Sequence, residues 1–177
     1  MTYKFIPLYL IVVVLTFIIH EAGHFLAGKV FGYEMFMSIN KAGIANRGTP
    51  DAQWHQQVIS IAGPVITYLQ AMIGTLISYR YKALWAFPIV FMAFMMRLMA
   101  AVISLFSPND EYRVSDWLGI GSWTLPIIAV IGLFALTVMA SRTLGLGWKS
   151  WLLSFVVCSA GITAIIFTEP FWPGIRW

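Results

Sequence analysis

The chain has 177 residues, of which 60% are hydrophobic and 10% are charged. A soluble domain carries about 25% charged residues, so this composition excludes an ordinary soluble enzyme and favours a protein surrounded by membrane lipid. The small net charge of +4 and the lack of a basic cluster argue against nucleic-acid binding, and the single cysteine, Cys158, excludes an intrachain disulfide and a cysteine-ligated zinc site.

Five apolar runs are long enough to cross a hydrocarbon core, which takes about 20 helical residues. The predicted spans cover residues 7–32, 58–79, 83–106, 123–141 and 148–168. We therefore predict an all-α polytopic membrane helix bundle that forms a single domain over residues 1–177. The first run is too long for the apolar part of a signal peptide and ends in no clear cleavage site, so we expect it to be retained. The expected location is a prokaryotic cell membrane, as a multi-pass protein.

The first span carries His20, Glu21 and His24 in the pattern HExxH. Residues i and i+4 of an α-helix share a face, so both imidazoles can reach one metal ion. In zinc proteases with this pattern, the glutamate is the general base toward a water that the metal polarises. Buried polar groups are costly in hydrocarbon unless they are paired or ligated. Three of them at this spacing favour a metal site over a metal-free hydrogen-bonded cluster.

A catalytic zinc site needs a third protein ligand and an open position. The extended pattern HExxHxxGxxH is absent, because Val30 stands at its third histidine. His55 lies just before the second span, where we interpret it as part of an interfacial polar segment. A thermolysin-like ligand pair has an aspartate four residues after its glutamate, whereas Glu111 and Asp116 are five apart.

The polar connections 33–57 and 107–122 lie on the side of the membrane where the first helix ends. Apart from Glu21, every carboxylate lies on this side, so a site that joins the histidines to a carboxylate is expected here. Lysines and arginines divide evenly between the two sides and do not fix the orientation. Arg97 lies inside the third span, where a charge is costly. It is a candidate to pair with a carboxylate, to bond helix carbonyls or to stabilise an oxyanion.

These residues resemble the site-2 protease family of intramembrane zinc metalloproteases. Its members carry HExxH in a transmembrane helix, an Ala-Gly-Pro element in a later helix, and an aspartate in a proline-containing Leu-Asp-Gly segment. The Ala-Gly-Pro at 62–64 and the segment 107–113 are similar to the last two. The resemblance covers about residues 8–120 and leaves the helices within 123–168 outside it.

The resemblance implies an endopeptidase with one Zn²⁺ ion per chain, which cuts the transmembrane segments of protein substrates. It implies that Asp110 is the third ligand and that Glu21 is the catalytic base. It also makes Gly63 and Pro64 a substrate-binding element. Asp116 is the alternative third ligand.

Two positions depart from the family pattern. Thr67 stands where the family has an asparagine, and we regard Thr67 and Arg97 as candidates to hold substrate or the oxyanion. Glu111 replaces the glycine that follows the aspartate. These departures motivate an alternative, a membrane adaptor or scaffold that binds metal without turnover. A small metal or proton transporter is less favoured, because transport needs access from both faces.

The order of the spans supports a shared site. The first and third spans run in the same direction, so their C-terminal halves reach the same membrane face as the start of the second. Asp110 follows the third span, whereas His20 lies near the middle of the first. We therefore expect the chain to turn back at residues 107–108 and to form a short helix over 111–118, with Asn109 or Asp110 as its cap.

Overall fold

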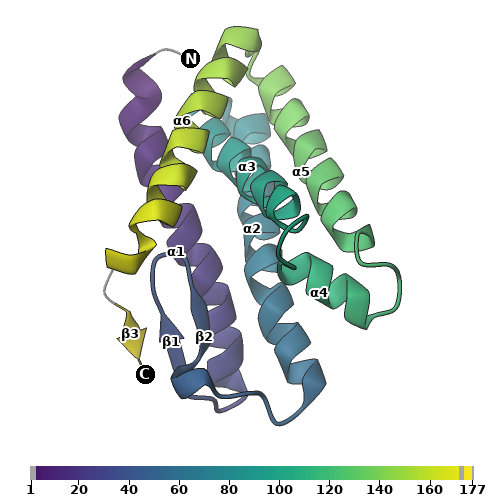
Figure 1. Ribbon diagram of the computed structural model, residues 1–177. Helices are drawn as coiled ribbons and strands as arrows, with labels where there is room; N and C mark the ends of the chain where they lie inside the picture. The colour runs from purple at the N-terminus through teal and green to yellow at the C-terminus, as the bar shows by residue number, and fades with distance from the viewer. Residues whose placement is uncertain (1–2, 172–173, 177) are drawn as a thin grey trace.

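The computed structural model describes residues 3–171 and 174–176 (Figure 1). Five long α-helices and one short helix, α4 (Asp110–Trp117), form a bundle in this part of the chain. The long helices are α1 (Ile6–Val30), α2 (Gln53–Tyr81), α3 (Phe87–Ile103), α5 (Thr124–Thr143) and α6 (Trp148–Thr168). Single 3-10 turns lie at Tyr3–Phe5, Ala45–Arg47, Leu84–Ala86 and Glu169–Phe171.

The long helices are membrane spans by length and by composition. Within the described residues, five helical segments of 20 to 29 residues are apolar enough to cross a bilayer. Their outward faces carry large exposed apolar side chains, including Leu15, Leu76 and Ile131, which suit contact with lipid. The predicted all-α polytopic bundle is confirmed, and the chain is a multi-pass integral membrane protein.

The helix boundaries differ most from the predicted spans at α2 and α3. Helix α2 begins at Gln53 rather than at 58, so His55 lies in its first turn and not before it. Polar side chains such as Gln56 occupy these first turns, and hydropathy does not register a polar turn as helix. Helix α3 is shorter than the predicted span 83–106 at both ends, because a 3-10 turn precedes it and the chain turns towards α4 after Ile103.

The connection between α1 and α2 contains a hairpin that the residue pattern does not predict. Strand β1 (Met35–Met37) pairs antiparallel with β2 (Ala42–Ile44), and β3 (Ile175–Arg176) pairs antiparallel with the other edge of β1. Strands of two or three residues are too short to show alternating polarity. The hairpin lies beside the second half of α1 (Figure 1), and both of its strands contact that helix.

Helices α1 and α2 pack closely at Gly23. A Cβ atom added there would lie 2.8 Å from Cδ1 of Ile66 and 3.0 Å from the carbonyl oxygen of Ala62, so a larger residue would push the helices apart. Farther along, Gln70 Nε2 donates a hydrogen bond of 2.7 Å to Thr16 Oγ1. The pairing brings the N-terminal half of α2 against the face of α1 that carries the histidines.

Helix α3 is the central helix of the bundle. Within an apolar stretch of 18 residues of its span 67% of the residues are buried, compared with between 33% and 44% in the corresponding stretches of the other four spans. Large side chains such as Phe87, Phe91 and Met95 fill its surroundings. Arg97, near the end of α3, therefore lies in the interior rather than against lipid, and is 4% exposed.

Candidate metal centre

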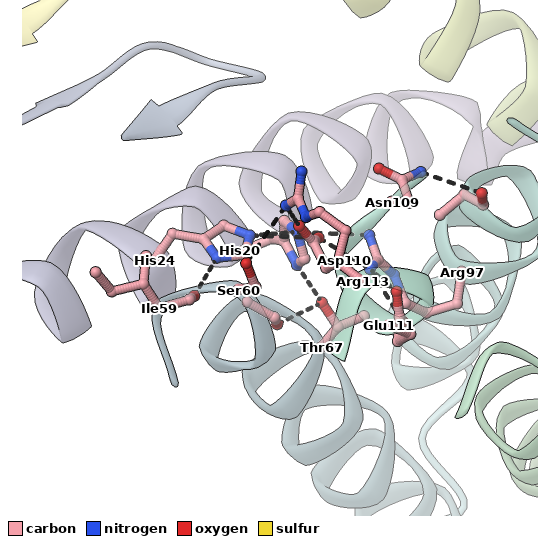
Figure 2. Close-up of polar contacts among 12 residues, drawn as sticks. His20, His24, Ile59, Ser60, Thr67, Arg97, Asn109, Asp110, Glu111 and Arg113 are labelled. Atoms are coloured by element: carbon pink, nitrogen blue, oxygen red, sulfur yellow. Dashed lines mark hydrogen bonds and ion pairs between the residues drawn. The ribbon is translucent and has the colours of Figure 1, made fainter. Parts of the chain in front are cut away.

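Three side chains from α1 and α4 converge in the interior of the bundle (Figure 2). His20 and His24 are one turn apart on α1, and both are buried. Their Nε2 atoms lie 3.1 Å from each other, and Asp110 Oδ2 lies 3.5 Å from each. These three side chains form a group that can hold a metal ion. The predicted ligands are thus brought together.

Helix α2 fixes the proton positions of both imidazoles. His24 Nδ1 donates a hydrogen bond of 2.6 Å to the carbonyl oxygen of Ile59, which can only accept. The Thr67 hydroxyl donates to the Gly63 carbonyl at 3.1 Å, so it accepts from His20 Nδ1 at 2.9 Å. Each neutral ring carries its proton on Nδ1, and both Nε2 lone pairs face the Asp110 carboxylate. Three electron-rich atoms facing one another repel unless a cation lies between them.

Gly63 leaves room for the two imidazoles. A Cβ atom at this position would lie 2.6 Å from His20 Cε1 and 2.7 Å from His24 Cε1, well inside van der Waals contact. Pro64, the next residue, points elsewhere and lines an apolar cavity of about 230 Å³ between α2 and α5. Of the two residues in the predicted substrate-binding element, Gly63 alone touches the histidines.

Gly63→Ala is expected to lower metal affinity by at least about 10-fold, because the added methyl group displaces the imidazoles from their common point. Metal titration of the purified protein measures the change. Gly147→Ala is the control, since a Cβ there meets nothing within 4 Å. Equal affinities of the wild type and Gly63→Ala would contradict the close packing of α2 on the ligands.

The chain reverses direction after α3, and this reversal brings Asp110 back beside His20 and His24. Asn109 Nδ2 donates to the carbonyl oxygen of Ala100 at 3.1 Å, and the Asn109 backbone N–H donates to Ser104 Oγ at 3.3 Å. The expected return of the chain and the short helix are confirmed, with α4 at Asp110–Trp117 instead of 111–118. Asn109 occupies the N-cap position, but its side chain bonds to α3 rather than to α4.

Asp110 lies among groups that stabilise its negative charge. The Arg97 Nη1 atom lies 3.6 Å from Asp110 Oδ2. Arg113 Nη2 also donates to Asp110 Oδ1 at 2.9 Å. The carboxylate of Asp110 therefore lies between two guanidinium groups. Asp116, the alternative ligand, is exposed at the far end of α4 and accepts from Ser122 Oγ at 2.7 Å.

A cavity of about 380 Å³ lies against the ligand group. Helices α1, α2, α3, α4 and α6 contribute to its wall, together with residues 40–44 of the hairpin. Glu21 lines this cavity and accepts a hydrogen bond from the backbone N–H of Ala42. Thr67 does not line it and lies behind His20, where it orients the ring instead of facing the cavity.

Arg97 contacts several groups of the site. Its Nη1 atom lies 3.1 Å from both carboxylate oxygens of Glu111 and 3.6 Å from Asp110 Oδ2. Its Nη2 atom lies 3.5 Å from His20 Nε2. A carboxylate partner for Arg97 was one of the roles predicted from the sequence, but Glu111 was not identified as that partner. The signal was available, since Glu111 follows the proposed ligand directly and Arg97 is the one cation deep inside a predicted span, whereas Lys29 and Lys149 lie near the ends of theirs.

His55 lies away from the ligand group. Its ring stacks on Phe31 with centroids 4.1 Å apart, and Tyr33 Oη is 2.6 Å from His55 Nδ1. Tyr33 Oη also accepts from the backbone N–H of Asp51 at 2.9 Å. These contacts tie the two ends of the connection between α1 and α2 together.

Comparisons of the chain with protein-family models, curated proteins and solved structures give no match.

Proposed function

We propose that this protein is an intramembrane zinc metalloendopeptidase that hydrolyses peptide bonds in the transmembrane segments of other proteins. The observation that carries the proposal is the convergence of three unprotonated donor atoms, from His20, His24 and Asp110, beside a cavity that Glu21 lines. Two nitrogens and one carboxylate oxygen with an open side are a donor set typical of catalytic zinc.

The spacing of the donor atoms fits zinc. Ligand atoms about 2.0–2.1 Å from a tetrahedral zinc ion lie about 3.3 Å from one another. The three separations between His20, His24 and Asp110 are 3.1, 3.5 and 3.5 Å. Thr67 and Ile59 hold the outer nitrogens of the two rings, as the partners of zinc-bound histidines commonly do. The residues therefore fit one zinc ion per chain.

The charges around the site favour a cation. Asp110 and Glu111 are paired with Arg113 and Arg97, whereas no ion pair compensates Glu21 among the described residues. The Glu21 carboxyl group beside the ligand group thus has no cationic partner among the described residues. A divalent cation bound between the three donors would lie next to it.

Different residues of the chain would have different roles in the hydrolysis. Bound zinc supplies a Lewis acid that polarises the peptide carbonyl and activates water. Glu21 takes the proton of the attacking water and returns it to the leaving nitrogen. The Arg97 guanidinium, beside the ligands, stabilises negative charge that develops on the carbonyl oxygen. Thr67 and Gly63 keep the imidazoles in place.

The substrate would be a membrane-embedded segment, because the spans form much of the wall of the cavity, together with α4 and the hairpin. Peptide carbonyls in a transmembrane helix are hydrogen-bonded within that helix. The segment must therefore unwind locally before one of its carbonyls can enter the cavity. The environment we propose for both proteins is a prokaryotic cell membrane.

Removal of zinc is expected to abolish cleavage of a single-span test substrate in proteoliposomes. A strong chelator should bring the rate to background, and stoichiometric Zn²⁺ should restore it, because without the ion no Lewis acid polarises the peptide carbonyl. Gel analysis of the fragments measures both steps. Full cleavage after the metal content has been shown to be zero would contradict the proposal.

A further inference from the structure

Arg97 and Glu111 form an ion pair inside the bundle, next to the ligand group. The Arg97 Nη1 atom lies 3.1 Å from both oxygens of the Glu111 carboxylate, and the two side chains are 4% and 7% exposed. Charges with so little access to water need partners of opposite sign, and replacing such a pair by apolar residues of similar size is often neutral for stability. General stability therefore does not explain why a pair stands here.

The pair is connected directly to two of the three ligands. Glu111 follows Asp110 in the first turn of α4, and Arg97 Nη1 lies 3.6 Å from Asp110 Oδ2. Arg97 Nη2 faces His20 Nε2 at 3.5 Å. Figure 2 shows the Arg97 and Glu111 side chains side by side, next to Asp110. The Arg97 guanidinium thus lies next to Glu111 and to two of the three proposed ligands, Asp110 and His20.

We propose that the Arg97–Glu111 pair is a positioning device that sets the rotation and depth of α4, so that Asp110 meets the two imidazoles. Consecutive residues of an α-helix are about 100° apart, so α4 cannot turn Asp110 away from His20 without pulling Glu111 off Arg97. Arg97, which holds Glu111 in this pair, belongs to α3, the most buried helix of the bundle. This inference rests on the metal site of the proposed function and is independent of proteolysis.

A double variant, Arg97→Met/Glu111→Leu, tests the positioning role. It removes one positive and one negative charge, so the net charge of the site stays the same and a change in metal binding reports geometry. Removal of both partners also avoids an unpaired buried charge, which preserves folding. Co²⁺ is the probe, because its visible absorption depends on the geometry of its ligands. We expect Co²⁺ affinity to fall by about 10–100-fold and the spectrum of the bound ion to change.

The control is Arg142→Met/Asp116→Leu, which makes the same kinds of substitution at exposed positions and should keep the wild-type affinity and spectrum. A folded Arg97→Met/Glu111→Leu protein with both properties unchanged would overturn the inference. A wild type that binds neither Co²⁺ nor Zn²⁺ would overturn the proposed function instead.

If the double variant does not fold, Arg97→Lys takes its place. It keeps the charge but loses the planar fork that reaches Glu111 and His20 together. A changed Co²⁺ spectrum is then expected, and an unchanged spectrum overturns the inference.

Discussion

Glu21→Gln is expected to reduce peptide cleavage by about 10²–10⁴-fold while the protein keeps its metal. Glutamine has nearly the shape of glutamate but cannot accept the proton of the attacking water. Glu21 is not one of the three converging ligands, and the backbone N–H of Ala42 can still donate to an amide oxygen at this position. The loss should therefore lie in the chemical step and not in the metal site.

The measurement is the cleavage rate of a single-span substrate in proteoliposomes, together with the metal content of the same preparations. Glu34→Gln is the control, because it makes the same substitution at a glutamate that does not line the cavity. Equal turnover by the wild type and Glu21→Gln would rule out Glu21 as the base. Zinc binding without cleavage dependent on Glu21 would support the adaptor or scaffold in place of the enzyme.

Asp110→Ala is expected to weaken metal binding by more than about 100-fold, which is beyond the usual effect of losing a residue that only orients a ligand. The variant removes a ligand and the charge that compensates Arg113, and Arg97 loses a second negative neighbour. A site with two neutral imidazoles beside two guanidiniums is a poor place for a divalent cation. Cleavage should fall with the metal content.

Zinc titration against a competing chelator measures the affinity of each variant. Asp116→Ala is the matched control, since this aspartate belongs to the same short helix but is exposed and bonds to Ser122. A large loss in Asp116→Ala with none in Asp110→Ala would reverse the assignment of the third ligand.

The sequence was sufficient for the features that depend on local pattern. Long apolar runs predict the five spans, and the spacing of His20 and His24 places both rings on one helical face. Asp110 was named by the family resemblance, and the direction of the spans and the proline after the third agreed with its return to the histidines. The spans and the shared face of the histidines need only helix geometry and the cost of polar groups in hydrocarbon.

Features that depend on contacts between distant segments were missed. His24 is held by the backbone carbonyl of Ile59. Every residue has such a carbonyl, so the residue type at position 59 does not predict this contact. Thr67 was a candidate to hold substrate or the oxyanion, whereas its hydroxyl bonds to His20 and lies behind the ring. The hairpin and α6 line the cavity through tertiary packing that no periodicity predicts.

The glutamate after Asp110 shows the same limit at a functional position. Compared with the family pattern, Glu111 looks like a loss of backbone freedom. In the structure it is the partner of Arg97, so two costly charges compensate each other inside the bundle. Each residue alone suggested a defect or a catalytic role, and only their pairing suggests how Asp110 is held.

Metal analysis of the purified protein tests the central claim most directly. The wild type should contain about one zinc ion per chain, held by the donor set of two imidazoles and one carboxylate. His24→Ala, which removes one imidazole and leaves Glu21 in place, should contain almost none. Zinc-free wild-type protein that stays empty when Zn²⁺ is supplied, or an equal zinc content in His24→Ala, would contradict the account.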